Sequence, residues 1–317
     1  MNLKKTLTFA VILLGIFGYI WYIELPSEKA TEEAKLLITG VEKEEIQQVV
    51  ITRGSESFKL INDSRWKIDQ PGYSDVDPGA INSLIAAILD FKVDSTIPTE
   101  DIEEDLTLYG LKDPLAQISF STKGEETTLS FGKKNDYTAK RYAKSDKDNK
   151  IFLVTDELFE AIQKSKDDFR DKTPIEYADT SVAAYRLKSS KRDYEFVSDE
   201  KGNWQATKPL QVTLSPASIS ELARNVRNLT AQKFYDPSAD KNAEKGAEKG
   251  AEKALDLKTY GLDKPLGTVE VVFKDSSVTP LTVSFSQKKI GNEENFVSVS
   301  GIPSVFSLAT NPLPQIY

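Results

Sequence analysis

The sequence contains neither cysteine nor histidine, and only one methionine, among its 317 residues. Without cysteine there is no disulfide framework and no thiol nucleophile, and without histidine there is no imidazole base, no Ser-His-Asp triad and no histidine-ligated zinc. No glycine-rich phosphate loop or dinucleotide-binding fingerprint follows any predicted strand. We therefore predict no cofactor, no metal site and no enzymatic activity, and any catalytic scheme would have to depend on carboxylates.

Long runs of one charge are also missing. The formal net charge is −8, and the charged residues, 28% of the chain, alternate in sign. A basic patch interleaved with aromatic residues, which is typical of nucleic-acid-binding proteins, does not occur. The sequence therefore predicts no nucleic-acid partner.

One long apolar run stands at the N-terminus. Two lysines precede an uncharged stretch from Thr6 to Ile23, which as a helix would be about 27 Å long and could cross a bilayer. Aromatic residues cluster at its far end, as at a membrane interface, and the lysines predict that the remainder is exported to the periplasm. Because no small-x-small cleavage site follows, we predict an uncleaved single-pass anchor in the bacterial inner membrane over residues 1–26 and a polar stalk over 27–45. A cleaved signal peptide is the competing interpretation.

A hexapeptide occurs twice in the remaining chain. Its shared positions are Tyr109, Gly110, Leu111 and Pro114 in the first copy and Tyr260, Gly261, Leu262 and Pro265 in the second. Glycine just past a helix end adopts a positive φ without steric cost, and the next residue then folds back onto the last turn. In both copies the apolar partner that this geometry requires is present, as Leu106 and Leu257. The pattern predicts two helices of the same kind, each ended by glycine.

Other stretches repeat in the same order. Trp66 and Pro71 return as Trp204 and Pro209, and Asp77-Pro78 returns at the same offset as Ser215-Pro216. The larger offset of the hexapeptide is explained by a low-complexity insertion at 242–253, which a surface loop tolerates at little cost in closure entropy. We therefore predict two tandem homologous modules, at 46–178 and 179–317.

Each module is predicted to have an α+β fold, an antiparallel sheet with a packed helix. Asp77 and Ser215 are good N-caps, and an apolar stripe at helical spacing follows each. Short helices are also expected at 101–109 and 257–260, and a closing helix from Thr155 towards Phe169. Strands are expected at 48–52, 57–61, 65–68, 116–121, 127–131, 137–143 and 151–154, then at 183–187, 194–197, 204–206, 268–273, 281–285, 296–299 and 305–308.

Acidic residues give two weak candidate sites. Asp146, Asp148 and Glu157 match three positions of a calcium-binding loop, but Ile151 stands where glycine is needed, so a hairpin turn is favoured. The acidic run 103–105 could serve acid–base chemistry, although acidic residues early in a short helix usually complement its dipole.

Two further sets have a structural and a functional interpretation. For Arg170 and Asp171, which lie at the predicted junction, we favour an inter-module clamp between arginine and carboxylate over a ligand site. Trp66 and Trp204 could stack on sugars, but a tryptophan at the same place in each copy indicates core packing.

In order and spacing, these features resemble the bacterial family known as domain of unknown function 4340. The resemblance is carried by Trp-x-x-x-x-Pro at 66–71 and 204–209, Tyr-Gly-Leu-x-x-Pro at 109–114 and 260–265, and Phe-Arg-Asp-Lys at 169–172. It implies an N-terminal membrane segment and a place beside gliding-motility-type ABC-transporter components. It implies no catalytic residue, and the insertion departs from the family pattern.

Three functional hypotheses follow. The preferred one is a non-enzymatic adaptor subunit of a membrane complex, plausibly an ABC-type transport assembly, with membrane protein partners. The second is a module that binds an envelope glycan or other polymer. The third is a carboxylate-dependent envelope hydrolase, which requires two acidic side chains to converge in one pocket.

Overall fold

The computed structural model describes residues 35–36, 38, 41–97, 105–122, 124–148, 150–239, 252–253 and 255–316. The predicted anchor at 1–26 lies outside these residues, as do most of the stalk and most of the insertion. No helix in the described part of the chain is long and apolar enough to span a membrane.

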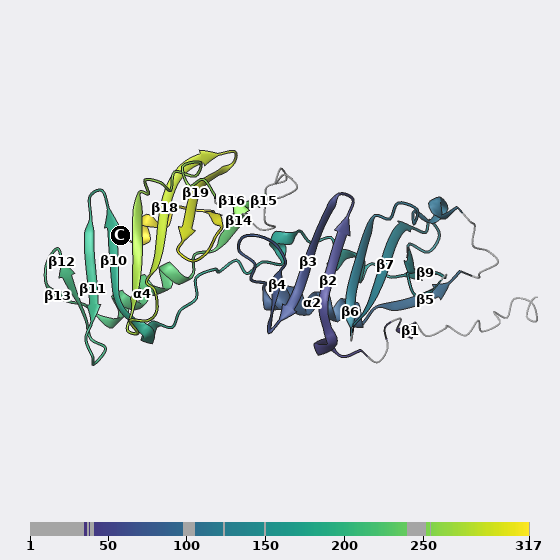
Figure 1. The fold of residues 1–317 in the computed structure, drawn as a ribbon, viewed down its shortest axis with the longest axis horizontal. Helices are drawn as coiled ribbons and strands as arrows, with labels where there is room; N and C mark the ends of the chain where they lie inside the picture. Colours follow the sequence, from purple (N-terminus) through teal and green to yellow (C-terminus); the bar gives the residue numbers. More distant parts are fainter. Residues whose placement is uncertain are drawn as a thin grey trace, which may run out of the picture. The chain divides into compact units, whose positions relative to one another are not determined.

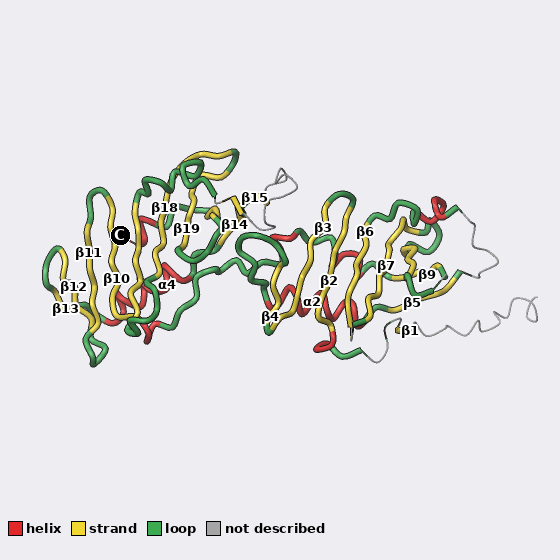
Figure 2. The backbone as a smooth tube through the Cα atoms, in the orientation of Figure 1, coloured by secondary structure: helices red, strands yellow, loops and turns green. Residues whose placement is uncertain are grey.

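The described chain is mainly antiparallel β-sheet with a few helices, so the predicted α+β mixture is confirmed (Figure 2). There are two nine-stranded sheets and a small two-stranded one. In spatial order the first sheet comprises β1 Lys35–Leu36, β5 Lys92–Thr96, β9 Ile151–Val154, β8 Arg141–Ser145, β7 Glu125–Lys134, β6 Ala116–Thr122, β2 Ile46–Arg53, β3 Glu56–Asp63 and β4 Arg65–Ile68. The second comprises β13 Val212–Thr213, β12 Trp204–Lys208, β11 Asp193–Ser198, β10 Val182–Ser189, β17 Gly267–Phe273, β18 Leu281–Ile290, β19 Glu293–Val299, β20 Val305–Leu308 and β14 Ala231–Tyr235. The small sheet pairs β15 Ser238–Ala239 with β16 Glu252–Lys253.

The two large sheets have the same strand order. The series β5-β9-β8-β7-β6-β2-β3-β4 corresponds strand for strand to β14-β20-β19-β18-β17-β10-β11-β12. In each sheet a three-stranded meander, β2-β3-β4 or β10-β11-β12, is followed by a helix. The next strand of the series, β5 or β14, lies at the other end of the series. Four later strands, β6–β9 or β17–β20, lie between it and the meander. This strand order requires pairing between strands that are far apart in the sequence. Its occurrence in both large sheets is therefore a specific similarity between them.

One long helix follows each meander. In α2 (Pro78–Leu89) the carboxylate of Asp77 accepts the Ala80 backbone N–H at 2.6 Å, and in α4 (Pro216–Arg227) the hydroxyl of Ser215 accepts the Ser218 N–H at 3.2 Å. Both predicted caps are therefore confirmed. Helix α4 lies along one face of the second sheet (Figure 1). Its apolar stripe is buried in a core shared with valines of β17, β18 and β19. The stripe of α2 is buried in the same way along Ile81, Leu84, Ile85 and Ile88.

The chain forms two compact units. Of the described residues, the first unit takes those up to Ile46, with Ile51–Glu56 and Leu84–Gln163, and the second takes Gln47–Val50, Ser57–Ser83 and the residues from Lys164 onward. The module boundaries drawn from the sequence stay predictions.

The shorter helices differ from expectation. The described part of the first is a single 3₁₀ turn, Leu106–Tyr109, which begins at a cap on Asp105, and residues 257–260 form turns, not a helix. The closing helix is only α3 (Glu157–Ala161), followed by a separate 3₁₀ turn at Lys166–Asp168. Ser165 and Asp168 cap each other reciprocally, and this capping box starts a new turn where the sequence pattern predicted continuation.

Six of the described strands were not predicted, namely β1, β5, β13, β14, β15 and β16, and one predicted strand was misplaced. β5 and β14, which belong to the strand order shared by the two sheets, are each only five residues long. Such short runs carry a weak strand signal, so their pairing depends on their place in the sheet. The strand expected at 137–143 begins only at Arg141, because the side chain of Asn135 accepts the backbone N–H groups of Tyr137 and Thr138 and closes a turn.

Candidate functional site

The repeated hexapeptide forms the same capped turn in both copies. Gly110 and Gly261 have left-handed φ angles of 66° and 70°. The Leu111 N–H bonds to the Leu106 carbonyl at 3.0 Å, and the Leu262 N–H bonds to the Leu257 carbonyl at 2.9 Å. These are the hydrogen bonds of a glycine C-cap, so the predicted cap geometry is confirmed although the helices before it are single turns. Pro114 and Pro265 are both half-buried after the turn.

Each capped turn rests on an equivalent strand position. A Cβ placed on Gly132 of β7 would lie 2.1 Å from the carbonyl oxygen of Tyr109, so only glycine fits there. The corresponding residue of β18 is Ser286, whose hydroxyl donates to the carbonyl of Tyr260. The tyrosine carbonyl of the hexapeptide thus contacts the sheet in both copies. In the first copy it packs closely against Gly132, and in the second it accepts a hydrogen bond from Ser286. The hexapeptide therefore forms a turn that docks on the sheet.

The two repeat tryptophans occupy equivalent strand positions but have different neighbours. Both are half-buried, on β4 and β12. The ring of Trp204 lies 5.6 Å from that of Tyr185 and packs on the second core, as predicted. Trp66 lines a cavity instead. Pro71 is half-buried and Pro209 is exposed.

A buried arginine organises the polar contacts of the second unit. The Arg170 side chain is 0% exposed, and its Nη2 lies 2.5 Å from Oδ2 of Asp236, whose side chain is 18% exposed. Its Nη1 lies 3.3 Å from the Asp167 carboxylate, and its guanidinium is 4.7 Å from the ring centroid of Phe234. Asp236 also accepts the hydroxyl of Ser304 at 2.8 Å. We call Arg170, Asp167, Asp236 and Ser304 the buried charge cluster.

Asp171 is engaged elsewhere. Its Oδ1 accepts the backbone N–H and the hydroxyl of Thr173, at 2.8 and 2.7 Å. Arg170 therefore forms its ion pairs with Asp167 and Asp236 and not with Asp171. The function of Arg170 and Asp171 as an inter-module clamp stays a prediction.

A second buried arginine belongs to the first unit. Arg141 donates to the Gly132 carbonyl at 2.7 Å and to Asp156 at 2.7 Å, and Lys134 lies 2.6 Å from the same carboxylate. Burial tends to raise the pKa of Asp156, but the hydrogen bonds and charges of Lys134 and Arg141 outweigh it and hold the pKa below its ordinary value.

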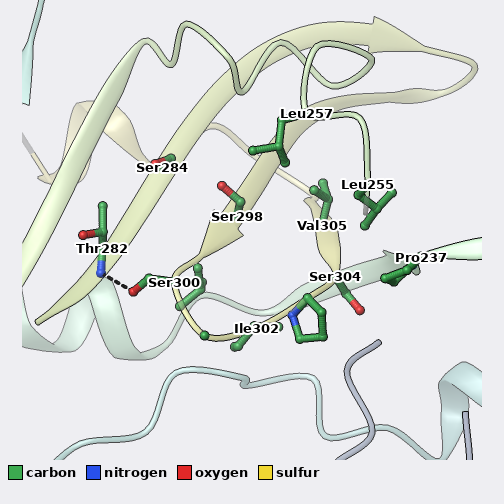
Figure 3. Close-up of a pocket in the computed structure, with 13 residues that line it drawn as sticks. Pro237, Leu255, Leu257, Thr282, Ser284, Ser298, Ser300, Ile302, Ser304 and Val305 are labelled. Carbon is green, nitrogen blue, oxygen red and sulfur yellow. Dashed lines mark hydrogen bonds between the residues drawn. The ribbon is translucent and has the colours of Figure 1, made fainter. Parts of the chain in front are cut away.

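A groove of about 490 Å³ lies on the second sheet. Figure 3 shows hydroxyl-bearing side chains of β18 and β19 on one side and apolar side chains on the other. The hydroxyls come from Thr282, Ser284 and Ser298 on the strands and from Ser300 and Ser304 on the loop before β20. The apolar side is formed by Pro237, Leu255, Leu257, Ile302, Pro303 and Val305. No side chain that lines this hydroxyl groove is titratable.

The β18–β19 ladder explains the position of the groove. Ser284 and Ser298 face each other across the two strands, and the Ser300 hydroxyl accepts the Thr282 N–H at 2.8 Å. Their neighbours Val283 and Phe285 alternate to the other face and are buried in the core with α4. The hydroxyls therefore occupy the sheet face opposite the helix.

A second cavity, of about 350 Å³, surrounds Trp66. We call it the Trp66 cavity. Its lining combines this indole and the phenol of Tyr73 with the carboxylates of Asp75 and Asp171 and the amide of Asn82. Burial raises the pKa of Tyr73 well above its ordinary value, and the charges of nearby Asp171 and Asp75 add to the effect.

Three of the weak acidic candidates, Asp146, Asp148 and Asp105, accept hydrogen bonds from backbone N–H groups. Asp146 accepts the Thr128 N–H at 2.9 Å and Asp148 accepts the Lys150 N–H at 2.6 Å, in the connection between β8 and β9. Asp105 caps Thr107, and hydrogen bonds from Thr107 lower the pKa of its carboxyl. No group of three potential ligands that could hold a metal ion occurs among the described residues.

Sequence reasoning missed Asp236 and the hydroxyl groove. Asp236 lies far along the chain from Arg170, and no local pattern connects them. The alternation of serine and threonine with buried residues in 281–285 and 296–299 was a usable signal, because it places hydroxyls on a single sheet face.

Comparisons with known proteins bear on the family but not on the activity. No curated protein and no solved structure matches the chain. A family described as "Domain of unknown function (DUF4340)" matches residues 66–250, more than half of the chain. The matched region includes Trp66, the first hexapeptide and the buried Arg170. The chain belongs to the DUF4340 family.

Proposed function

We propose that the protein is a non-enzymatic, membrane-anchored accessory subunit on the extracytoplasmic side of the bacterial inner membrane, acting in an ABC-type transport complex. Residues 1–26 would supply the anchor, because they combine a bilayer-length apolar run with flanking lysines. The acidic exported part would then present its binding surface to a partner protein.

We further propose that one ancestral module was doubled. The shared strand order of the two large sheets supports this, together with the paired glycine caps and their equivalent docking positions on β7 and β18. A doubled module offers two related scaffolds, only one of which needs to keep a binding groove.

The observation that carries the adaptor proposal is the lining of the hydroxyl groove. Its walls are apolar on one side and hydroxyl-bearing on the other, with no titratable group to transfer a proton. Such a lining suits an uncharged extended segment, whose apolar side chains contact Leu255 and Leu257 while its backbone groups bond to the hydroxyls. We therefore assign the groove to an extended, uncharged segment of a partner membrane protein.

The test is affinity purification of the full-length protein from native membranes in a mild detergent. Ser284→Trp and Ser298→Trp fill the groove from half-buried positions, and Thr213→Trp on an exposed edge strand is the matched control. We expect membrane transport subunits to co-purify with the wild type and with the control, and to be lost from the groove variants. Isolation of the wild type as a lone monomer, or equal recovery of partners with the groove variants, would contradict the proposal.

The two alternative functions both depend on the Trp66 cavity. Glycan binding is favoured by the tryptophan on the wall of this cavity. A carboxylate-dependent hydrolase is less well supported, although Asp75 and Asp171 share the cavity. Asp75 is paired with Arg65 at 2.9 Å and Asp171 accepts two hydrogen bonds from Thr173, so both carboxylates already act as acceptors.

A further inference from the structure

The Trp66 cavity has the composition of a ligand site and not of a core. Its volume of about 350 Å³ lies within the range of small-molecule pockets. It combines an aromatic ring with polar groups of both hydrogen-bonding types, namely the guanidinium of Arg65, the amide of Asn82 and the carboxylate of Glu176. All of its lining residues belong to the second compact unit.

The repeat provides an internal comparison for this tryptophan. Trp66 pairs across β3–β4 with Asn62, and Trp204 pairs across β11–β12 with Ser198, at corresponding places in the two meanders. Trp204 packs on Tyr185 within an apolar cluster. At the same position in the first copy, the indole instead borders a cavity that charged side chains also line, so core packing alone does not account for Trp66.

Two polar groups of the cavity are free to bind a ligand. Within the described part of the chain, neither the Asn82 amide nor the Glu176 carboxylate makes a hydrogen bond or ion pair. Tyr73 is held in place from behind, because its ring stacks on Phe234 at 5.3 Å and its backbone N–H donates to Ser304 at 2.6 Å. The cavity therefore joins a rigid aromatic wall to exposed polar groups that are accessible to a ligand.

We propose that the Trp66 cavity binds one or two units of a neutral or amino saccharide, with Trp66 as the stacking face. The apolar C–H face of a pyranose ring covers an indole, while its adjacent hydroxyls take hydrogen bonds from an amide and donate to carboxylates. Three carboxylates, those of Asp75, Asp171 and Glu176, line the cavity against the single guanidinium of Arg65. This excess of negative charge disfavours uronic acids and phosphorylated sugars.

The experiment uses the full-length protein in a detergent without a sugar headgroup. Isothermal titration calorimetry and tryptophan fluorescence follow the addition of three probes: cellotriose as a neutral sugar, a glucosamine trimer as an amino sugar, and trigalacturonate as an acidic sugar. The variants are Trp66→Ala, Asn82→Ala, and Trp204→Phe as the matched control at the second repeat position. Circular dichroism confirms that each variant is folded.

We expect saturable binding of the neutral or the amino trimer and none of the acidic one. Trp66→Ala and Asn82→Ala should each weaken binding roughly tenfold or more, and Trp204→Phe should leave the affinity unchanged. Absence of saturable binding of the neutral and amino trimers up to about 10 mM, unchanged affinity in the Trp66→Ala variant, or equal binding of trigalacturonate would each overturn the proposal. The result is independent of the adaptor proposal, because partner recovery and sugar binding are measured separately and at different cavities.

Discussion

Replacement of Arg170 by methionine tests the buried charge cluster. Methionine keeps the length and the apolar stem of arginine but removes the guanidinium from a side chain that is 0% exposed. Loss of one partner from a buried ion pair costs about 3–5 kcal/mol, because the remaining charge is left without compensation. Asp236 keeps Lys166 at 3.4 Å and Ser304 at 2.8 Å and is 18% exposed. We therefore reduce the expected loss in the free energy of unfolding to about 2–3 kcal/mol.

Arg186 provides the matched control. It also reaches two carboxylates, Glu195 and Glu270, each at 3.0 Å, but its side chain is 49% exposed. Solvent screens such a pair, so Arg186→Met should cost at most about 1 kcal/mol. The double variant Arg170→Met/Asp236→Leu should be more stable than Arg170→Met alone, because no unpaired charge then stays buried.

The assay is equilibrium unfolding in urea of the full-length protein, in detergent and in a Trp21→Phe background. The remaining tryptophans, Trp66 and Trp204, both lie in the unit that contains the cluster and therefore report on it directly. Two results would contradict the view that Arg170 compensates a buried charge. One is an equal loss in the free energy of unfolding for Arg170→Met and Arg186→Met, and the other is further destabilisation of the Arg170→Met protein by Asp236→Leu.

Two other predictions concern Gly132 and Asp156 of the first unit, and Gly79 of the second unit provides a control. In thermal melts, Gly132→Ala should lower the free energy of unfolding by about 2–4 kcal/mol, because the added Cβ would lie 2.1 Å from the Tyr109 carbonyl oxygen. The control is Gly79→Ala in helix α2, where the added Cβ would have one neighbouring atom within 4 Å, Oδ1 of Asp77 at 3.1 Å. This control variant should be nearly as stable as the wild type. The lowered pKa of Asp156 contributes stability that is present above the unfolded-state value of about 3.9 and is lost as the pH falls through the folded value. The melting temperature of Asp156→Asn should therefore decline less steeply than that of the wild type below about pH 4. An identical decline in both proteins would show that ionisation of Asp156 does not contribute to stability.

Local signals in the sequence predicted the caps and the repeat. The N-caps at Asp77 and Ser215 and the glycine caps at Gly110 and Gly261 depend on residues within one turn of each other, so the sequence contains all the necessary information. Helix length was less predictable, because a capping box at Ser165 interrupts an apolar pattern that continues beyond it. Among the unpredicted strands, neither β5 nor β14 carries a strong pattern of its own, and both form where the sheet offers them a partner.

The candidate sites were largely beyond prediction. Arg170 was singled out, but its partner Asp236 depends on tertiary folding, and Asp171, its neighbour in sequence, bonds to Thr173 instead. Trp66 and Trp204 look alike in the sequence, and only the structure shows that one borders a cavity while the other packs on a core. Chemistry that arises from long-range contacts cannot be predicted from spacing along the chain.

Site-specific photo-crosslinking in native membranes tests whether the hydroxyl groove binds a membrane transport subunit. A photoreactive phenylalanine analogue at Ser298 places the crosslinker in the hydroxyl groove, and the same analogue at Thr213 serves as the control on an exposed edge strand. We expect a discrete adduct between the Ser298 variant and a membrane transport subunit, and none from the Thr213 variant. Lack of any adduct at Ser298, or an identical set of adducts from both positions, would contradict this expectation.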